Sequence, residues 1–166
     1  GSADRRRFLD RIVSNLVPDH TENCIKYSKA LKQRNKLIKD KVTDSYWYDA
    51  VENQMALSGI EIDRARSSVV GSIMEMQNKS VSFFPMADLE IVGSQYLSVQ
   101  EFQLALSENR KKDLFVGRTL IGPHLSDLAA LYSSKGIDAK NCSTGEQKSL
   151  LISIIIATAK IQLEVF

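Results

Sequence analysis

The sequence predicts a mostly α, α+β fold with a long antiparallel helical hairpin, a small β element and a final helix. Apolar residues recur every three or four positions over two long stretches, 19–41 and 44–77, as they do along one face of a helix. After residue 80 come shorter segments rich in β-branched and aromatic residues, separated by turn sequences. With only 8 glycines and 3 prolines in 166 residues, few positions would interrupt long helices.

Three helices are expected in the first half of the chain. The first carries apolar residues at helical spacing from Phe8 to Leu16 and ends before Pro18. The second, 19–41, has an apolar arc opposite a lysine-rich arc, and a short link at 42–45 would fold it against the third as an antiparallel hairpin. Gly59 and Gly71 allow a bend or a break in the third helix. Its apolar stripe comprises Trp47, Val51, Met55, Ser58, Ile62, Ala65, Val69, Ile73 and Met76.

The second half predicts shorter elements. Strand-like content lies at 81–84, 88–92 and 114–121, and 128–132 and 137–141 flank a hairpin turn. Ser98 and Glu101 form a capping box that opens one helix, and the last helix begins at Ser143. The expected domain organisation is a helical arm at 1–80, a small α+β region at 81–142, and the final helix with its preceding turn at 143–166.

Composition excludes several classes of protein. The formal net charge is only +2, so bulk charge does not indicate a nucleic-acid partner and local clustering must decide. Cys24 and Cys142 lack the spacing of a disulfide framework or a zinc site, which favours a reducing, cytoplasmic location. Residues 150–165 are apolar on all sides but too short and too polar to span a membrane, so we expect a buried helix and no membrane partner.

The turn before the last helix has the chemistry of an anion site. Ser143 and Glu146 can cap the helix reciprocally, and Gly145 has no side chain to block close approach. Free amides and the positive end of the helix dipole favour a bound anion at such a position. Taken alone, the same spacing is most often only a helix cap.

The string Ser143-Thr144-Gly145-Glu146-Gln147-Lys148, followed by Ser149-Leu150-Leu151, resembles the signature motif of the RecF family, relatives of the SMC and ABC ATPases. Three further segments resemble RecF hallmarks in the family's order: residues 4–11 (DRRRFLDR), Gln33-Arg34-Asn35, and Gly122-Pro123-His124 with Asp127. The resemblance therefore covers essentially the whole chain. Leu125 and Ser126 depart from it, because a basic and then an acidic or small residue is common there.

This resemblance implies a segment of an ABC/SMC-like ATPase. In the family, two heads dimerise around ATP, and the signature turn of one subunit contacts the γ-phosphate of nucleotide held by the other. Carried over, the contacting or flanking residues are Ser143, Thr144, Gly145, Glu146, Gln147 and Lys148. ATP and Mg²⁺ would be cofactors of the full-length protein, a weak ATPase. This chain contains no G-x-x-x-x-G-K-[ST] and no strand ending in paired acids after the last helix, so alone it is not expected to hydrolyse ATP.

The resemblance also implies roles in DNA repair, recombination, replication and the SOS response. The partners would be duplex DNA and single-strand/double-strand junctions, a second RecF subunit and the mediator RecR. Candidate DNA contacts are Lys26, Lys29, Lys32, Lys36 and Lys39 of the second helix, with Arg5, Arg6 and Arg7. The alternative for these cations is an ordinary solvated surface; Arg34 and Asn35 flank the apolar side, which favours a structural role. Two other functions stay open: a stand-alone helical interaction module, or the signature region of another SMC- or ABC-like ATPase.

Overall fold

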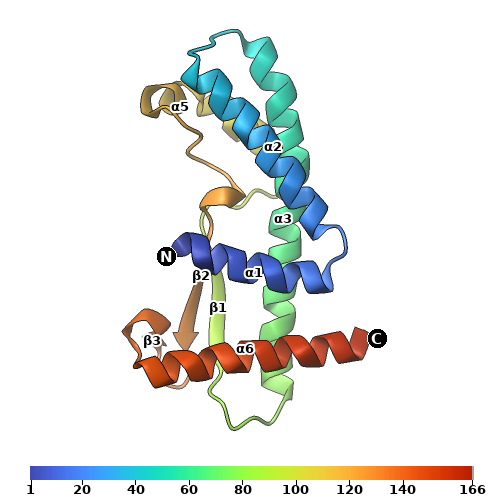
Figure 1. The fold of residues 1–166 in the computed structure, drawn as a ribbon, viewed down its shortest axis with the longest axis vertical. Helices are drawn as coiled ribbons and strands as arrows, with labels where there is room; N and C mark the ends of the chain where they lie inside the picture. The colour runs from blue at the N-terminus through green and yellow to red at the C-terminus, as the bar shows by residue number, and fades with distance from the viewer. Residues whose placement is uncertain (166) are drawn as a thin grey trace. The chain divides into compact units, whose positions relative to one another are not determined.

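The computed structural model describes residues 1–165, and these residues are mostly helical with one small sheet. This confirms the predicted fold class. The helices are α1 (Ser2–Leu16), α2 (His20–Lys39), α3 (Ser45–Lys79), α4 (Val99–Glu108), α5 (Arg110–Val116) and α6 (Thr144–Val165) (Figure 1). The strands are β1 (Ala87–Val92), β2 (Asp127–Tyr132) and β3 (Ile137–Asp138), and short 3₁₀ turns cover Pro123–Leu125 and Ala139–Asn141.

The chain forms two compact units, each assembled from separate stretches of sequence. The sheet unit contains Gly1–Leu16, Arg66–Val92 and the residues from Asp127 onward, and the hairpin unit contains Val17–Ala65 and Gly93–Ser126. These boundaries differ from the three consecutive segments expected from the sequence. The reason is topological, because β1 pairs with a strand that begins 35 residues after it ends (127 against 92) and α3 has residues in both units.

In the sheet unit, the strands form an antiparallel sheet in the order β1-β2-β3, with Ala87 opposite Tyr132 and Val92 opposite Asp127. The predicted hairpin at 133–136 joins β2 to β3, although β3 is shorter than expected. α1 lies against β2, and α6 lies against β1. The strand expected at 81–84 is wrong: within residues 1–165 this segment pairs with no strand, and the side chains of Val81 and Phe83 are fully exposed.

A glutamine side chain holds α3, β1 and α6 together. The Gln77 amide donates to the Ala87 carbonyl at 3.0 Å and accepts from the Ala87 amide at 2.9 Å, as a neighbouring strand would. The Ser153 hydroxyl of α6 donates to the same Gln77 oxygen at 3.1 Å. All of these atoms are buried, so the interactions replace water rather than compete with it.

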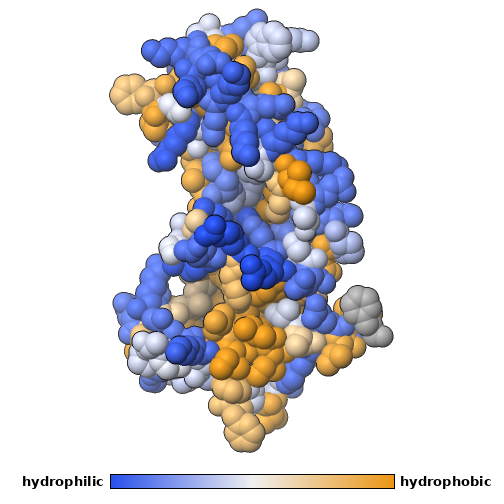
Figure 2. Space-filling model, in the orientation of Figure 1, coloured by the Kyte–Doolittle hydropathy of each residue, from blue (hydrophilic) through white to orange (hydrophobic). Residues whose placement is uncertain are grey.

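One face of α6 is covered and another is exposed. Leu150, Ser153, Ile154, Ala157 and Thr158 are buried, while Leu151, Ile152 and Ile155 are 39–50% exposed. Figure 2 shows apolar side chains gathered over this helix. The structure therefore corrects the expectation of a fully buried helix. Among residues 1–165, no helix combines the length and apolar character needed to cross a membrane.

In the hairpin unit, α2 and the first half of α3 run antiparallel (Figure 1), as the sequence predicts. Their core also receives two side chains from α4. It consists of Tyr27, Ala30, Met55, Ala56, Ile60, Ile62, Phe102 and Leu106. α3 continues unbroken through Gly59, where a Cβ would lie 2.6 Å from the Phe102 ring. Gly59 is therefore a point of close packing between α3 and α4 rather than a helix break.

Two further predictions for this unit are wrong. Trp47 is 56% exposed, and its neighbour Tyr48, at 1%, takes the buried position at the start of α3. The strand expected at 114–121 is instead α5 followed by an irregular segment, and Gly117 ends the helix with a left-handed φ of 90°.

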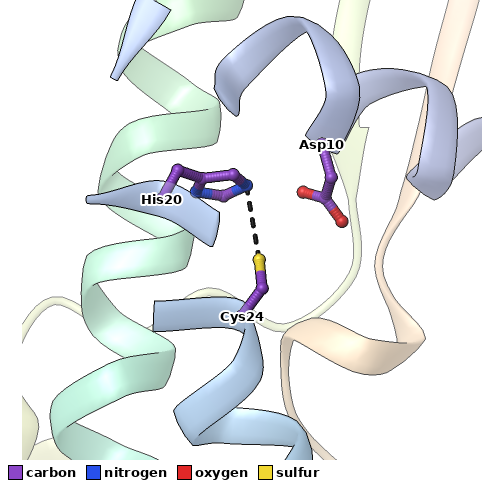
Figure 3. A group of neighbouring side chains, drawn as sticks. All are labelled: Asp10, His20 and Cys24. Atoms are coloured by element: carbon purple, nitrogen blue, oxygen red, sulfur yellow. Dashed lines mark hydrogen bonds between the residues drawn. The ribbon is translucent and has the colours of Figure 1, made fainter. Parts of the chain in front are cut away.

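The predicted start of α4 at a serine cap is confirmed. The Ser98 hydroxyl accepts from the Glu101 amide at 3.1 Å and opens α4 as expected. At the start of α2, the ring of His20 faces the thiol of Cys24 one turn later, with Nε2 and Sγ 3.5 Å apart (Figure 3). Neither Cys24 nor Cys142 forms a disulfide bond within residues 1–165.

Candidate functional site

The turn that opens α6 is ordered by a reciprocal cap. The Glu146 amide donates to Ser143 Oγ at 3.2 Å, and the Ser143 amide donates to Glu146 Oε2 at 2.9 Å. This is the predicted capping box. It fixes the backbone at the helix N-terminus and satisfies two of its amides.

Two side-chain contacts hold this turn in place, and one of them reaches the β-hairpin. Lys135, in the turn between β2 and β3, forms an ion pair with Glu146, and this contact holds the pKa of the Glu146 carboxyl below its usual value. The Gln147 side chain donates to the Cys142 carbonyl at 3.2 Å. The turn is therefore anchored on both sides of the Ser143 cap.

The centre of the turn is open. The amides of Thr144 and Gly145 make no hydrogen bond within residues 1–165, and both residues are exposed. A Cβ built on Gly145 would meet nothing within 4 Å, so the approach to these amides is unobstructed. Ser143, Gln147 and Lys148 are also exposed, and Glu146 is half-buried. Two free amides, a hydroxyl, a nearby lysine and the positive end of a 22-residue helix make this turn able to hold an anion.

Two of the motifs found in the sequence meet in the sheet unit. Both Nε and Nη2 of Arg5 on α1 donate to the carboxylate of Asp127, the first residue of β2, at 2.7 Å. This pairing lowers the pKa of Asp127. From the sequence, Arg5 was a candidate DNA contact and no role was expected for Asp127. The two residues lie 122 positions apart, so no local sequence signal predicts the contact.

Other charges of the first motif also have partners. Arg7 forms an ion pair with Asp4, and Asp10 accepts two hydrogen bonds from Arg66 of α3 at 2.8 and 2.9 Å. Arg66 is 5% exposed. Arg5 and Asp10 of the 4–11 motif therefore have partners on other elements, whereas the Arg7–Asp4 pair is exposed, and DNA contact by Arg5, Arg6 and Arg7 stays a prediction.

The predicted basic face of α2 is exposed along its whole length. Lys26 pairs with Glu22 and Lys36 with Asp40, at 2.6 and 3.6 Å. Within the described residues, Lys29, Lys32 and Lys39 have no carboxylate partner. Figure 2 shows hydrophilic side chains over this helix. The lysines thus form a row of accessible cations, and their ion pairs within residues 1–165 are to Glu22 of α2 and to Asp40, which follows α2.

Arg34, expected to be structural, lies at the centre of a fully buried network. Its guanidinium donates to Glu52 Oε1 at 3.1 Å, Asp113 Oδ2 at 2.7 Å, Thr119 Oγ1 at 2.8 Å and the Leu106 carbonyl at 3.0 Å. Arg34 and Asp113 are 0% exposed and Glu52 is 1% exposed. Beside Arg34, Asn35 Oδ1 accepts from the amide and the hydroxyl of Thr119. The Gln33-Arg34-Asn35 motif therefore joins α2 to α3, α5 and the segment after α5.

Sequence reasoning missed the acidic half of this network. The Glu52 carboxylate also accepts two hydrogen bonds from Arg110, at 3.0 and 2.6 Å. Arg110 donates a further hydrogen bond to Asp49 at 2.5 Å. The ring of Tyr48 lies under both guanidinium groups, 5.9 Å from Arg34 and 5.3 Å from Arg110, and burial raises the pKa of its hydroxyl. The available signal was the position of Glu52, which lies one turn before Met55 of the apolar stripe of α3, because a buried carboxylate requires a cation.

The Gly122-Pro123-His124 motif forms a tight contact with α2. His124 Nδ1 lies 2.8 Å from the Tyr27 hydroxyl, and its Nε2 lies 3.3 Å from the Thr119 carbonyl. Gly122 has a φ of 129°, and a Cβ there would lie 2.2 Å from the Tyr27 oxygen. Both ring nitrogens of His124 therefore have partners within the hairpin unit, which gives this residue a role in packing the turn against α2.

Comparisons with known proteins place this arrangement in a family. The chain is 39% identical over 171 residues to the DNA replication and repair protein RecF of Mesorhizobium japonicum, covering 96% of this chain and 45% of that protein. RecF of Rhizobium meliloti is 39% identical over 170 residues, with 96% and 46% covered, and RecF of Brucella abortus is 38% identical over 175 residues, with 99% and 46% covered. No protein-family model matches the chain.

Solved structures agree on the fold. Two structures of the recombination mediator protein RecF in the RecFOR pathway, one of RecF-ATPrS and one of RecF-ATP, superimpose with TM-scores of 0.78 and 0.82. Each is 21% identical to this chain, and the match covers 99% of this chain and 47% of the other. The chain spans less than half the length of the curated relatives it matches. From its sequence identity to these relatives and its shared fold, the chain belongs to the RecF family, of which it represents the segment that carries the signature turn.

Proposed function

We propose that this chain is the signature-bearing segment of an ATP-switched DNA-binding protein that acts in recombinational repair and replication-fork maintenance in the cytoplasm. The turn at 143–148 contacts the terminal phosphate of ATP·Mg²⁺ held by a second copy of the protein. Closure of the two copies around DNA then depends on ATP, and hydrolysis by the full-length protein, a weak ATPase, releases the DNA. The mediator RecR is the proposed protein partner.

One observation carries the proposal. The amides of Thr144 and Gly145 are exposed and have no hydrogen-bond partner among the described residues, while the cap and the hairpin hold the backbone around them fixed. A phosphate at this position would accept from both amides without first breaking a protein hydrogen bond. The Ser143 hydroxyl, which already accepts from Glu146, still has a proton to donate.

The row of lysines on α2 supplies the proposed duplex-binding surface. Lys29, Lys32, Lys36 and Lys39 fall within an arc of ~80° on the helix, at 100° per residue. Neutralising phosphates with such a row releases counterions, so the affinity should fall steeply with salt. The proposal assigns ATP sensing to the sheet unit and duplex binding to the hairpin unit.

The test of the phosphate contact uses a full-length RecF that carries this segment. Ser143→Arg places a bulky side chain over the two amides. We expect it to abolish ATP-dependent dimerisation, measured by analytical ultracentrifugation, while ATP binding by the separate subunits changes less than twofold. The nucleotide-binding loop belongs to the opposite subunit in this arrangement, which is why the two measurements should separate.

Ser134→Arg is the matched control, because Ser134 is an exposed serine in the β-hairpin turn of the same unit. It should leave dimerisation unchanged. If Ser143→Arg weakened ATP binding and dimerisation equally, or left dimerisation intact, the contact in trans would be refuted.

A further inference from the structure

Helix α5 presents an exposed aromatic ring between two lysines. Phe115 follows Lys111 by four residues and Lys112 by three, so both lysines are its neighbours on the helix surface. At 100° per residue, they lie ~40° and ~60° to either side of the ring. The Phe115 side chain is 92% exposed, and both lysines are exposed. Arg118, also exposed, follows the helix-ending Gly117.

These cations are available to a ligand. Among residues 1–165, no carboxylate forms an ion pair with Lys111, Lys112 or Arg118. Figure 2 shows apolar side chains next to hydrophilic ones over α5. We call Lys111, Lys112, Phe115 and Arg118 the α5 face.

The opposite side of α5 is fixed in the core. Asp113 is fully buried and bonds to Arg34, to the Asn109 side chain at 2.7 Å and to the Leu120 amide at 3.0 Å. The first residue of the helix, Arg110, is held by Glu52. A seven-residue helix is not stable alone, so this buried network is what sets the direction of the exposed ring.

A ring that projects alone between cations suits one kind of ligand better than another. An apolar peptide side chain would need a pocket, and the ring is 92% exposed rather than set in one. A nucleobase needs only a flat face to stack on, and neighbouring phosphates need cations. In a duplex the bases are already stacked on one another, so only unpaired bases can use the ring.

We infer that the α5 face binds single-stranded nucleic acid by stacking an unpaired base on Phe115 while Lys111, Lys112 and Arg118 neutralise the adjacent phosphates. The inference extends the proposed DNA-binding function by assigning unpaired and duplex strands to different helices of the hairpin unit, α5 and α2. It does not depend on ATP or on the signature turn. The α5 face thereby distinguishes a single-strand/double-strand junction from plain duplex.

The experiment measures binding of this chain, without ATP, to a fluorescent oligothymidine and to a duplex of equal length. Phe115→Leu keeps an apolar side chain but removes the stacking face. Loss of one stacked base, at about 1–3 kcal/mol, corresponds to roughly 5- to 150-fold weaker binding to oligothymidine. Duplex affinity should change less than twofold. Because Phe115 is exposed, the variant should keep the parent's circular dichroism spectrum and unfolding midpoint.

A direct readout uses the single tryptophan of the chain, Trp47. In a Trp47→Phe background, Phe115→Trp places the only indole at the α5 face. Oligothymidine should quench its fluorescence with the same midpoint as the anisotropy titration, and duplex should not. Phe83→Leu is the matched control, since Phe83 is another fully exposed phenylalanine but has no lysine or arginine within three residues in sequence. It should bind like the parent.

The outcomes separate the alternatives. Equal losses for oligothymidine and duplex, or unchanged binding after Phe115→Leu, would overturn the stacking site. So would an indole at 115 that is quenched by an acidic peptide and not by oligothymidine, because that result would indicate a protein partner. The double variant Lys29→Glu with Lys32→Glu should weaken binding to duplex more than binding to oligothymidine. If it does not, the duplex-binding role proposed for α2 is wrong, and this result leaves the test of the α5 face unaffected.

Discussion

The buried charge network of the hairpin unit gives the sharpest stability prediction. Arg34→Met keeps a long unbranched side chain but removes four hydrogen bonds, those to Glu52, Asp113, Thr119 and Leu106. Glu52 keeps Arg110 as a partner, so the carboxylate left without a cation is that of Asp113, which is 0% exposed. Breaking a buried ion pair by removing one partner costs about 3–5 kcal/mol.

Urea unfolding of the chain, followed by circular dichroism, measures this cost. For a slope of about 2 kcal/mol per molar urea, the midpoint should fall by roughly 2 M. Arg64→Met is the matched control, because Arg64 is an exposed arginine of α3 that pairs with Glu61 at 2.8 Å. Its effect should stay within about 0.5 kcal/mol.

A double variant tests the reasoning behind the magnitude. Asp113→Asn keeps an oxygen for the Leu120 amide and removes the negative charge. If the orphaned carboxylate is the main cost, Arg34→Met with Asp113→Asn should be more stable than the sum of the two single effects by about 1–3 kcal/mol. Strict additivity, or a loss below about 1 kcal/mol for Arg34→Met alone, would refute the account.

Three smaller predictions follow from local geometry. Gly145→Ala should leave stability unchanged or raise it by up to about 1 kcal/mol, because its Cβ meets nothing, yet it should weaken ATP-dependent dimerisation of the full-length protein in ultracentrifugation. Gly122→Ala should cost about 1–3 kcal/mol in urea unfolding, since it strains a positive φ and meets the Tyr27 hydroxyl, whereas Gly71→Ala, which meets nothing, should cost none. Arg5→Gln should lower the free energy of unfolding by up to about 1 kcal/mol at neutral pH. Arg5 lowers the folded-state pKa of Asp127, so the difference in free energy of unfolding between variant and parent should persist above about pH 4. It should disappear as acidification protonates Asp127. A difference that does not change with pH would exclude this ion pair as its source.

Features governed by neighbours within four residues were predictable from the sequence. The helix caps at Ser98 and Ser143 form as expected, because each serine hydroxyl accepts from an amide three residues later. At Ser143 the capping box is reciprocal, whereas Glu101 accepts from the Leu97 amide instead of the Ser98 amide. The helix boundaries before Pro18 and near residue 40 depend on equally local signals. The signature turn could therefore be located and its openness anticipated without a structure.

Features that depend on distant partners were not predictable. Residues 114–116 have strand-like content, but Asp113 pairs with Arg34, 79 positions away, and that pairing holds the segment as a helix. Trp47 and Tyr48 are adjacent and both aromatic, so local sequence does not show which of them is buried. Tyr48 is buried, with the guanidinium groups of Arg34 and Arg110 over its ring.

Periodicity and capping act within a few residues, so the helical hairpin, the capped signature turn and the lysine row could be read from the order of the amino acids. The fold was needed to show that Arg5 meets Asp127, that Arg34 meets Glu52 and Asp113, and that Phe115 on α5 is exposed. A buried charge must lie next to a counter-charge in space, and that partner can come from any part of the chain.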